Sequence, residues 1–199
     1  MKRLFFMMLM FCTLIVGAQN TMFDVCPLKV GSEIPSTMLA TTDAEMITLD
    51  SLVNSKPTVL VFYRGAWCGY CRKHLAELTD IKTEVEDLGY QILGITVDQA
   101  SKLNETNEKA GSEIDVYADV AAETIKAFGL NWEVDDTLFN KYKSEYKLDL
   151  EVWSGDDHHQ LPVPAIFVIK DGLVQFQYVN PEYSIRLKPT TLLAVLETL

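Results

Sequence analysis

The stretch Tyr63-Arg64-Gly65-Ala66-Trp67-Cys68-Gly69-Tyr70-Cys71 decides the fold of this chain. It continues the apolar run 57–63, and apolar residues then recur every three or four positions from Leu75 to Leu88. The first pattern predicts a buried strand, and the second predicts an amphipathic helix over 70–88. The strand therefore delivers the first sulfur of a Cys-x-x-Cys motif to the N-terminus of a helix.

Two thiols one helical turn apart have a geometry suited to redox chemistry. The unpaired N–H groups and the dipole at a helix N-terminus favour an anion, so we expect the Cys68 thiol to ionise easily. Thiols at such sites have their pKa lowered from about 8.5 into the range of roughly 3.5–7.5. Cys71 lies within disulfide reach of Cys68. The motif predicts a catalytic dithiol.

The N-terminus has the pattern of a secretory signal peptide. Lys2 and Arg3 precede the apolar run 4–16, and small residues follow at 16–18. A buried core helix is the alternative interpretation. We expect residues 1–18 to be removed and residues 19–199 to form a single domain, exported to the periplasm or secreted. No later run is long enough to span a membrane.

Charge and cysteine content narrow the class of protein. Loss of Lys2 and Arg3 takes the formal net charge from −11 to −13, and so acidic a chain is not expected to bind nucleic acid. Three cysteines remain after residue 18, an odd number that is not typical of a scaffold of structural disulfides. Cys26 is then either a quiet thiol or a third redox partner.

Metal binding is a weaker alternative. Cys68, Cys71, His158 and His159 could together supply four ligands, but adjacent histidines more often point apart, and zinc sites usually need closely set pairs. We expect no metal and no other cofactor.

The remaining pattern predicts an α/β fold of thioredoxin-like type, with a central mixed β-sheet flanked by helices. The expected elements are an N-terminal β-hairpin at 38–40 and 46–49, strands at 58–63, 90–97 and 116–117, helices at 70–88, 99–110 and 121–128, a second hairpin at 165–169 and 173–179, and a closing helix at 190–199. A βαβ half followed by a ββα half accounts for this order.

Residues 131–160 form an insertion that a minimal fold of this type does not need. The segment is rich in aromatic and acidic residues, and its helical part is expected over 136–147. Its aromatic side chains either pack the insertion onto the domain or form a wall beside the dithiol that selects substrates.

The segment 63–71, taken with Leu161-Pro162-Val163-Pro164-Ala165-Ile166-Phe167-Val168-Ile169, resembles the peroxiredoxin-like branch of the alkyl hydroperoxide reductase/thiol-specific antioxidant (AhpC/TSA) family, within the thioredoxin superfamily. The resemblance runs from about Pro27 to the C-terminus. It implies that Pro164 is a cis-proline beside the dithiol, with the backbone of Val163 held ready to pair with an extended substrate.

The chain departs from the peroxiredoxin pattern at the reacting site. The proline, threonine and peroxidatic cysteine of that pattern fall on Arg64, Cys68 and Cys71, and the distant arginine falls near Pro164. The proline, threonine and arginine that bind the peroxide are therefore absent from their expected places. The two cysteines and the proline of the thioredoxin pattern are present, which favours thiol–disulfide exchange.

The chain also departs from thioredoxin. Phe62 stands where thioredoxin keeps a buried acid, so another base or water must serve; His74 and Glu77 are candidates, although each is more typical of a solvated helix surface. Tyr70 replaces the proline between the cysteines, and its ring can shield the buried sulfur. Arg64 either adds positive potential near Cys68 or belongs to the loop surface.

The sequence thus predicts a thiol-disulfide oxidoreductase of extracytoplasmic redox homeostasis. Cys68 attacks a disulfide, Cys71 resolves the mixed disulfide, and Trp67, Gly69, Tyr70, Arg64, Val163 and Pro164 support the site or contact the substrate. The expected partners are proteins with disulfides or thiols and a thiol reductant. The alternative is a peroxiredoxin-like antioxidant peroxidase that reduces hydroperoxides. The oligomeric state is left open.

Overall fold

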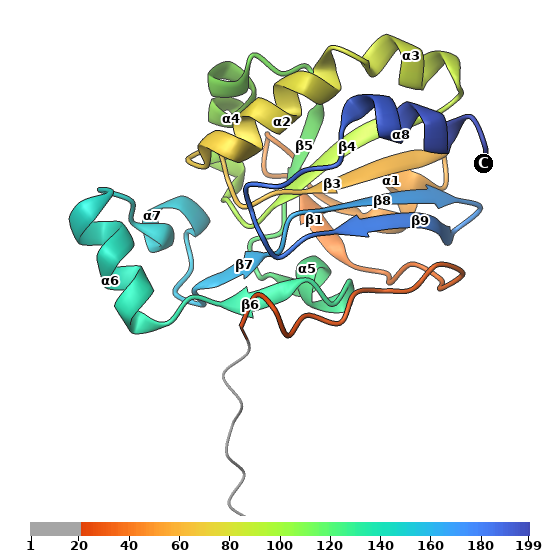
Figure 1. The fold of residues 1–199 in the computed structure, drawn as a ribbon. Helices are drawn as coiled ribbons and strands as arrows, with labels where there is room; N and C mark the ends of the chain where they lie inside the picture. Colours follow the sequence, from red (N-terminus) through yellow and green to blue (C-terminus); the bar gives the residue numbers. More distant parts are fainter. Residues whose placement is uncertain (1–20) are drawn as a thin grey trace, which may run out of the picture.

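The computed structural model describes residues 21–199 (Figure 1). The predicted signal peptide lies outside these residues. The elements are β1 (Met38–Ala40), β2 (Met46–Thr48), α1 (Leu49–Val53), β3 (Thr58–Phe62), α2 (Gly69–Thr79), α3 (Lys82–Asp87), β4 (Gln91–Thr96), η1 (Ala100–Lys102), α4 (Leu103–Ala110), β5 (Asp115–Ala118), α5 (Glu123–Ala127), β6 (Asn131–Glu133), α6 (Asp136–Glu145), α7 (Leu150–Ser154), β7 (Gln160–Pro162), β8 (Ala165–Lys170), β9 (Leu173–Val179) and α8 (Pro189–Leu196).

Seven strands form one mixed sheet in the order β2-β1-β5-β4-β3-β8-β9. Strands β3, β4 and β5 are parallel, whereas β8 runs antiparallel to β3 and β9 antiparallel to β8. The predicted N-terminal hairpin is present, because β1 pairs with β2 from Met38–Thr48 to Ala40–Met46. The predicted α/β thioredoxin-like fold is confirmed.

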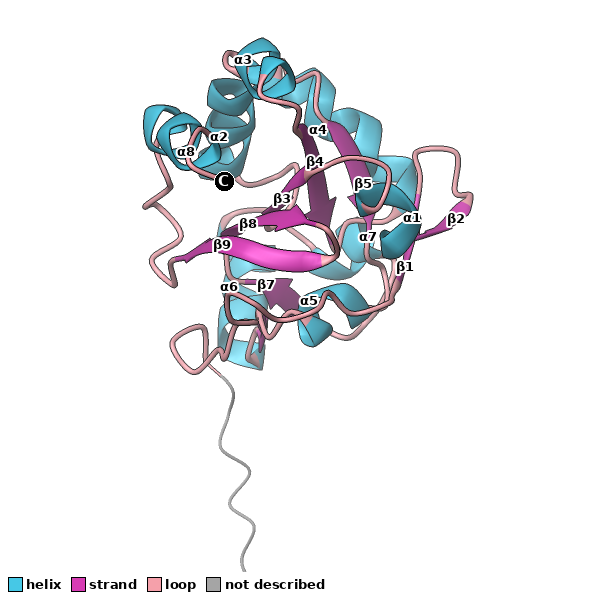
Figure 2. Ribbon diagram, turned by 90° about the vertical axis from the view of Figure 1, so that its right-hand side faces the viewer, coloured by secondary structure: helices cyan, strands magenta, loops and turns pink. Residues whose placement is uncertain are grey.

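Helices cover both faces of the sheet (Figures 1 and 2). Successive side chains of a strand point to opposite faces, and β3 divides its residues accordingly. Val59 and Val61 join a core with α2, α3, α4 and α8, while Leu60 and Phe62 join a second core with α1 and α5. Because both faces are covered, every residue of β3 is buried, which explains its unbroken apolar run.

The long helix predicted over 70–88 is wrong in one respect, because it is two helices. Helix α2 ends at Thr79, and Ile81 has a non-helical backbone with φ −108° and ψ 10° before α3 begins. The Thr79 hydroxyl donates to the Leu75 carbonyl at 2.9 Å, and its oxygen accepts from the Glu113 backbone N–H at 3.3 Å. Such back-bonding by threonine bends or ends helices.

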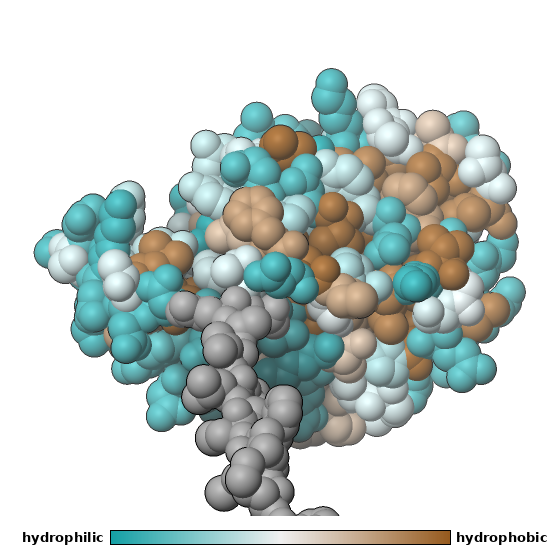
Figure 3. Space-filling view, turned by 60° about the horizontal axis from the view of Figure 1, so that its bottom comes forward, coloured by the Kyte–Doolittle hydropathy of each residue, from teal (hydrophilic) through white to brown (hydrophobic). Residues whose placement is uncertain are grey.

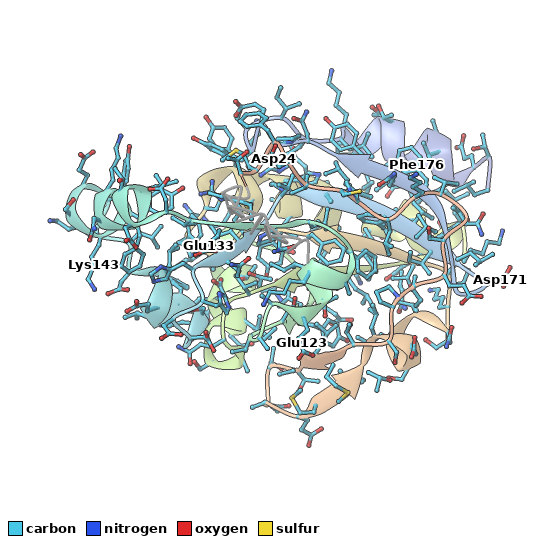
Figure 4. The ribbon with its side chains drawn as sticks, turned by 90° about the horizontal axis from the view of Figure 1, so that it is seen from below. Asp24, Glu123, Glu133, Lys143, Asp171 and Phe176 are labelled. Atoms are coloured by element: carbon cyan, nitrogen blue, oxygen red, sulfur yellow. The ribbon has the colours of Figure 1, made fainter. Side chains whose placement is uncertain are left out.

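The insertion at 131–160 is anchored by a two-stranded antiparallel sheet of β6 and β7. Helices α6 and α7 lie between these two strands in the sequence, and they protrude at the left of Figure 1. Asp135 starts α6 by accepting a hydrogen bond from the Leu138 N–H at 2.8 Å. Hydrophilic residues dominate the surface of this protruding part (Figure 3), and Lys143 on α6 lies at the opposite end of the molecule from Asp171 in the β8–β9 turn (Figure 4).

Within residues 21–199, the structure contains no helix with the length and apolar character needed to cross a lipid bilayer.

Candidate active site

The dithiol lies where the strand β3 leads into helix α2. Cys68 is the N-cap residue of α2, and Cys71 lies in its first turn. The Cys68 carbonyl accepts hydrogen bonds from the N–H groups of Cys71 and Arg72 at 3.1 and 3.0 Å. Both cysteines are buried, and their thiols are free, as is that of the exposed Cys26. The structure thus places the first sulfur at a helix N-terminus, as the motif predicts.

The two thiols differ in acidity. A hydrogen bond from the Cys71 thiol is the main cause that lowers the pKa of Cys68 to about 6, against the opposing effect of burial; the Arg64 charge, the Cys71 backbone N–H and the Arg186 charge lower it further. Burial raises the pKa of Cys71 well above its usual value, and the neighbouring Cys68 adds to this. Cys68 is therefore the thiol that ionises more readily, and Cys71 is the thiol that keeps its proton.

Arg64 is buried among aromatic rings rather than exposed on a loop. Its Nη2 donates to the Tyr142 hydroxyl at 2.6 Å, and its guanidinium carbon lies 4.6 Å from the ring centre of Tyr183 and 4.9 Å from that of Trp67. Arg64 is 5% exposed, its Nε has no hydrogen-bond partner, and no carboxylate of the described residues pairs with it. The Cys68 thiolate is the anion whose formation this cation favours.

A second cation reaches the site from the loop between β9 and α8. Arg186 Nη2 lies 3.6 Å from Cys71 Sγ, and its Nη1 donates to the carbonyls of Tyr183 and Ile185. Sequence reasoning missed Arg186, because it belongs to no motif and lies far along the chain from the cysteines. Only the packing of the loop against α2 brings it there.

A buried acid organises the loop before the dithiol. Asp98 follows β4, and its carboxylate accepts from the Ala66 N–H at 2.8 Å and from the Trp67 side chain. Burial is the main cause that raises the pKa of Asp98 to about 7. Gly65 has φ +149°, and a Cβ there would lie 2.3 Å from Trp67 Nε1 and 2.7 Å from Asp98 Oδ1. Only glycine leaves room for this bond, so Gly65 and Asp98 together hold Trp67.

Asp98 is a further residue that sequence reasoning missed. The sequence signal that could have identified it is an acidic residue directly after a buried strand. Because β3 and β4 are parallel, their carboxyl ends lie at the same edge of the sheet, next to the dithiol.

The two bases proposed from the sequence have different surroundings. Glu77 stays near the surface, where its carboxylate lies 3.6 Å from Lys73 Nζ. The expectation of a solvated His74 is wrong, because His74 is 5% exposed and its Nε2 has no partner. His74 shares the buried face of α2 with Cys71 and Leu78, and the backbone of Leu187 covers it. Burial lowers the pKa of His74 to about 4.

The predicted cis bond at Pro164 is also wrong, since the described residues contain no cis peptide. The Val163 N–H donates to the Leu130 carbonyl at 2.8 Å, and the Pro164 carbonyl accepts from the Asn180 N–H at 3.3 Å. The chain therefore passes from β7 to β8 in an extended form with these groups already paired. A trans X-Pro bond is the ordinary preference, by about 0.5–1 kcal/mol. The Val163 N–H is consequently not free to pair with a substrate strand.

A cavity of about 910 Å³ opens beside Cys68. Arg64, Trp67, Gly69 and Tyr70 line it from the dithiol side, whereas Val163 and Pro164, the other two residues predicted to support the site, do not line it. Side chains of the insertion line its other side: Leu138, Tyr142, Tyr146 and Trp153. Tyr142 and Trp153 also pack against the core, so the insertion both packs onto the domain and lines the cavity, while selection of substrates by it stays a prediction.

The histidines considered for metal binding have other contacts. His158 Nε2 lies 2.9 Å from the Val120 carbonyl, and His159 Nε2 lies 2.9 Å from a Glu151 carboxylate oxygen. The part of the chain that the structure describes brings together no group of three or more histidine, cysteine, aspartate or glutamate residues able to hold a metal ion.

The sequence matches a known family and named relatives. The sequence model of the AhpC/TSA family matches residues 30–177. A putative peroxiredoxin bcp of Haemophilus influenzae is 28% identical over 147 residues, which cover 68% of this chain and 94% of that protein. A thioredoxin-like protein of the same organism is 28% identical over 121 residues, 61% of this chain and 68% of that protein.

Solved structures support the fold. The reduced Prx3 of Vibrio vulnificus in complex with hydrogen peroxide aligns with a TM-score of 0.69 at 20% identity, covering 85% of this chain and 99% of that one. The peroxidoxin BcpB of Mycobacterium tuberculosis aligns with a TM-score of 0.65 at 18% identity, covering 86% and 97%.

Proposed function

The chain belongs to the AhpC/TSA family of peroxiredoxin-like enzymes, within the thioredoxin superfamily, and from this premise we propose that it is a thiol peroxidase whose reacting groups are Cys68 and Cys71. Hydroperoxides are the oxidising substrates, and a thiol reductant restores the dithiol. Peroxide reduction, the alternative prediction from the sequence, thereby takes precedence over disulfide exchange.

The observation that carries this proposal is the asymmetry of the two thiols. The pKa of Cys68 is lowered to about 6, so this sulfur is mostly thiolate at neutral pH, while burial keeps the proton on Cys71. A peroxidase needs this combination, because a thiolate attacks the peroxide and a protonated thiol then condenses with the product.

The reaction has two steps. The Cys68 thiolate attacks the terminal oxygen of ROOH, the O–O bond breaks, and the leaving alkoxide takes a proton from solvent to become ROH; Cys68 is thereby oxidised to a sulfenic acid. Cys71 then attacks the sulfenic sulfur, its proton leaves with the hydroxyl as water, and the Cys68–Cys71 disulfide forms. Two thiols of the reductant regenerate the dithiol.

Arg64 and Arg186 supply the positive charge for this chemistry. The family pattern's arginine is missing, but Arg64 and Arg186 both lower the pKa of Cys68. Arg64 lines the cavity beside Cys68 and has no carboxylate partner among the described residues, and such a positive charge stabilises charge that develops as the O–O bond breaks.

Thiol–disulfide exchange is the second candidate. It is favoured by Cys68, which stands where the family pattern has threonine and completes a Cys-x-x-Cys motif at a helix N-terminus. The same thiolate can attack a disulfide sulfur, with Cys71 again resolving the product.

A direct rate comparison tests the assignment. The reduced mature domain is mixed with hydrogen peroxide or with insulin as a protein disulfide, and oxidation of the dithiol is followed by tryptophan fluorescence. We expect faster oxidation by the peroxide, loss of the reaction in Cys68→Ser, and a trappable sulfenic acid in Cys71→Ser. Faster oxidation by insulin, with no sulfenic acid in Cys71→Ser, would make disulfide exchange the function instead.

We also propose that the domain of residues 19–199 acts outside the cytoplasm after removal of residues 1–18. The order of charged, apolar and small residues supports this. The mass of the protein recovered from cells that express the full chain tests it: a start at Gln19 is expected, and an intact Met1 in an exported or a cytoplasmic fraction contradicts it.

A further inference from the structure

The cavity beside Cys68 is much larger than hydrogen peroxide requires. Its volume is about 910 Å³, whereas a water molecule occupies about 30 Å³ of the liquid. Sites for drug-sized ligands have volumes of about 300–1,000 Å³. The helices α6 and α7, which contribute one side of the cavity, stand on the side of the molecule where α2 begins (Figure 1). The size of the cavity therefore fits an organic molecule that reaches Cys68.

The lining of the cavity combines aromatic rings with positive charge. Six aromatic residues surround it: Trp67, Tyr70, Tyr142, Tyr146, Trp153 and Tyr183. Five cations also line it, namely Arg64, Arg72, Lys109, Lys141 and Lys147, and none of its lining residues is an aspartate or glutamate. In a chain of net charge −11, a cavity without acids is a local reversal of the overall charge. An anion with an apolar body matches this lining.

Four of these cations form no ion pair with a carboxylate of the described residues. Lys109 already pairs with Glu105 at 2.7 Å. Lys141 and Lys147 form no ion pair with a carboxylate of the described residues, although Lys147 Nζ donates to the Ser144 carbonyl at 2.8 Å. Arg64 and Arg72 are the other two, and their guanidinium groups donate to the Tyr142 hydroxyl at 2.6 Å and to the Ala66 carbonyl at 2.8 Å. Two of these cations, Arg64 and Arg72, thus belong to the segment around the dithiol, and two lie on the insertion.

We propose that the cavity selects organic hydroperoxides that carry a carboxylate on an apolar or aromatic body. The hydroperoxide group meets Cys68 and Arg64, the body packs on the aromatic rings, and the carboxylate pairs with Lys141 and Lys147. This inference rests on the peroxidase function proposed above and adds the substrate class. The Cys68 thiolate takes the terminal oxygen and becomes a sulfenic acid as the O–O bond breaks. The carboxylated alkoxide leaves, takes a proton from solvent and is released as the alcohol.

A pair of substrates that differ in charge and by one methyl group provides the test. The probes are cumene hydroperoxide with a para-carboxylate and the methyl ester of the same compound, with kcat/KM measured for each. We expect a preference for the acid on the order of tenfold, which two surface ion pairs can supply, and a smaller preference at high salt.

The variant Lys141→Glu/Lys147→Glu should lose this preference for the acid over the ester. The matched control is Lys29→Glu/Lys126→Glu, which changes the net charge equally at exposed lysines that do not line the cavity and should keep the preference. Equal kcat/KM for acid and ester in the unaltered protein, or an unchanged preference in Lys141→Glu/Lys147→Glu, would overturn the inference.

Failure of the peroxidase function looks different from failure of the inference. Without peroxidase function, the reduced protein reacts slowly with every hydroperoxide, hydrogen peroxide included. Binding of 4-isopropylbenzoate, which carries no peroxide, is then measured by tryptophan fluorescence against its methyl ester. Tighter binding of the acid supports carboxylate recognition by the cavity even then, and equal binding contradicts it.

Discussion

The guanidinium of Arg186 lies 3.6 Å from the sulfur of Cys71, although 115 positions separate the two residues. Arg186 lowers the pKa of Cys68 at the N-cap of α2, and also those of Cys71 and His74 on the buried face of the helix. The loop therefore belongs to the reacting site as much as the Cys-x-x-Cys motif does.

Replacing Arg186 by glutamine should slow both steps. The pKa of Cys68 should rise, because one of the cations that favour its thiolate is removed. We expect a loss of about two- to threefold in the rate of peroxide reaction at pH 6, because Arg186 is the smallest of the causes that lower this pKa, and a smaller loss at pH 8, where more of the thiol ionises. Ultraviolet absorbance of the thiolate against pH measures the shift. Arg186→Lys keeps the charge and should retain most of the rate; an unshifted titration in Arg186→Gln argues against the role.

The pH profile of the reaction should follow the Cys68 thiolate. With a pKa of about 6, the rate constant for oxidation of the reduced protein should rise as pH increases through 6 and level off above pH 7. Stopped-flow fluorescence in the variant Cys26→Ser, which removes the exposed third thiol, gives the profile without interference. An inflection near the pH of an ordinary cysteine, about 8.5, is the contrary result.

Replacing Arg64 by methionine should separate activity from stability. A buried charge without a carboxylate partner costs desolvation, so we expect a free energy of unfolding that is unchanged or higher by about 1 kcal/mol. The rate with hydrogen peroxide should nevertheless fall at least tenfold, because the thiolate loses its buried cation. Urea unfolding and peroxide kinetics provide the two readouts. A large loss of stability with normal activity would make Arg64 a structural residue only.

The variant Gly65→Ala should destabilise the fold by about 2–4 kcal/mol. The added Cβ would meet Trp67 Nε1 and Asp98 Oδ1, and alanine is strained at φ +149°. Gly172→Ala is the matched control, since Gly172 also has positive φ, +72°, but a Cβ there meets no atom within 4 Å. Urea unfolding of both variants separates the cost of the steric clash from the cost of the backbone strain. An equal loss in the free energy of unfolding for the two variants would show that the Trp67–Asp98 hydrogen bond does not require a glycine at position 65.

Asp98 should make stability depend on pH. Its pKa is raised to about 7 in the folded protein, so between the unfolded value near 3.8 and pH 7 the native state holds a proton that the unfolded state has lost. The protonated Asp98 therefore contributes at most roughly 4 kcal/mol to the free energy of unfolding. This contribution is fully present below about pH 4 and is lost as pH rises through 7. Asp98→Asn should flatten the dependence. Parallel pH curves of unfolding free energy for the two proteins would contradict this.

Much of the dithiol's immediate setting could be predicted from the sequence, because it depends on neighbours along the chain. An apolar strand, a Cys-x-x-Cys and a helical repeat place Cys68 at the start of α2 without reference to the rest of the fold. The groups that tune the sulfur come from elsewhere: Asp98 from the next parallel strand and Arg186 from the last loop. Such contacts depend on packing between elements, which no local pattern encodes.

Two errors have the same origin. His74 looked like a polar residue on a helix surface, but the loop before α8 covers that face of α2. Pro164 looked like a cis-proline by resemblance, but the strands β6 and β7 of the insertion lead into an extended chain whose Val163 N–H pairs with Leu130. In both cases a segment remote in sequence determined the local conformation.

The division of the sheet into two cores has a consequence for how this protein can diversify. Helix α2 and its cysteines are held by the core on one face, whereas the insertion is attached to the other. Substitutions on the exposed side of α6, such as at Lys141, leave the packing around the sulfurs untouched. Substitutions at Lys141 are thus expected to alter the proposed substrate preference without repacking the sulfurs, whereas Tyr142 on the same helix accepts a hydrogen bond from Arg64 and links the insertion to the dithiol.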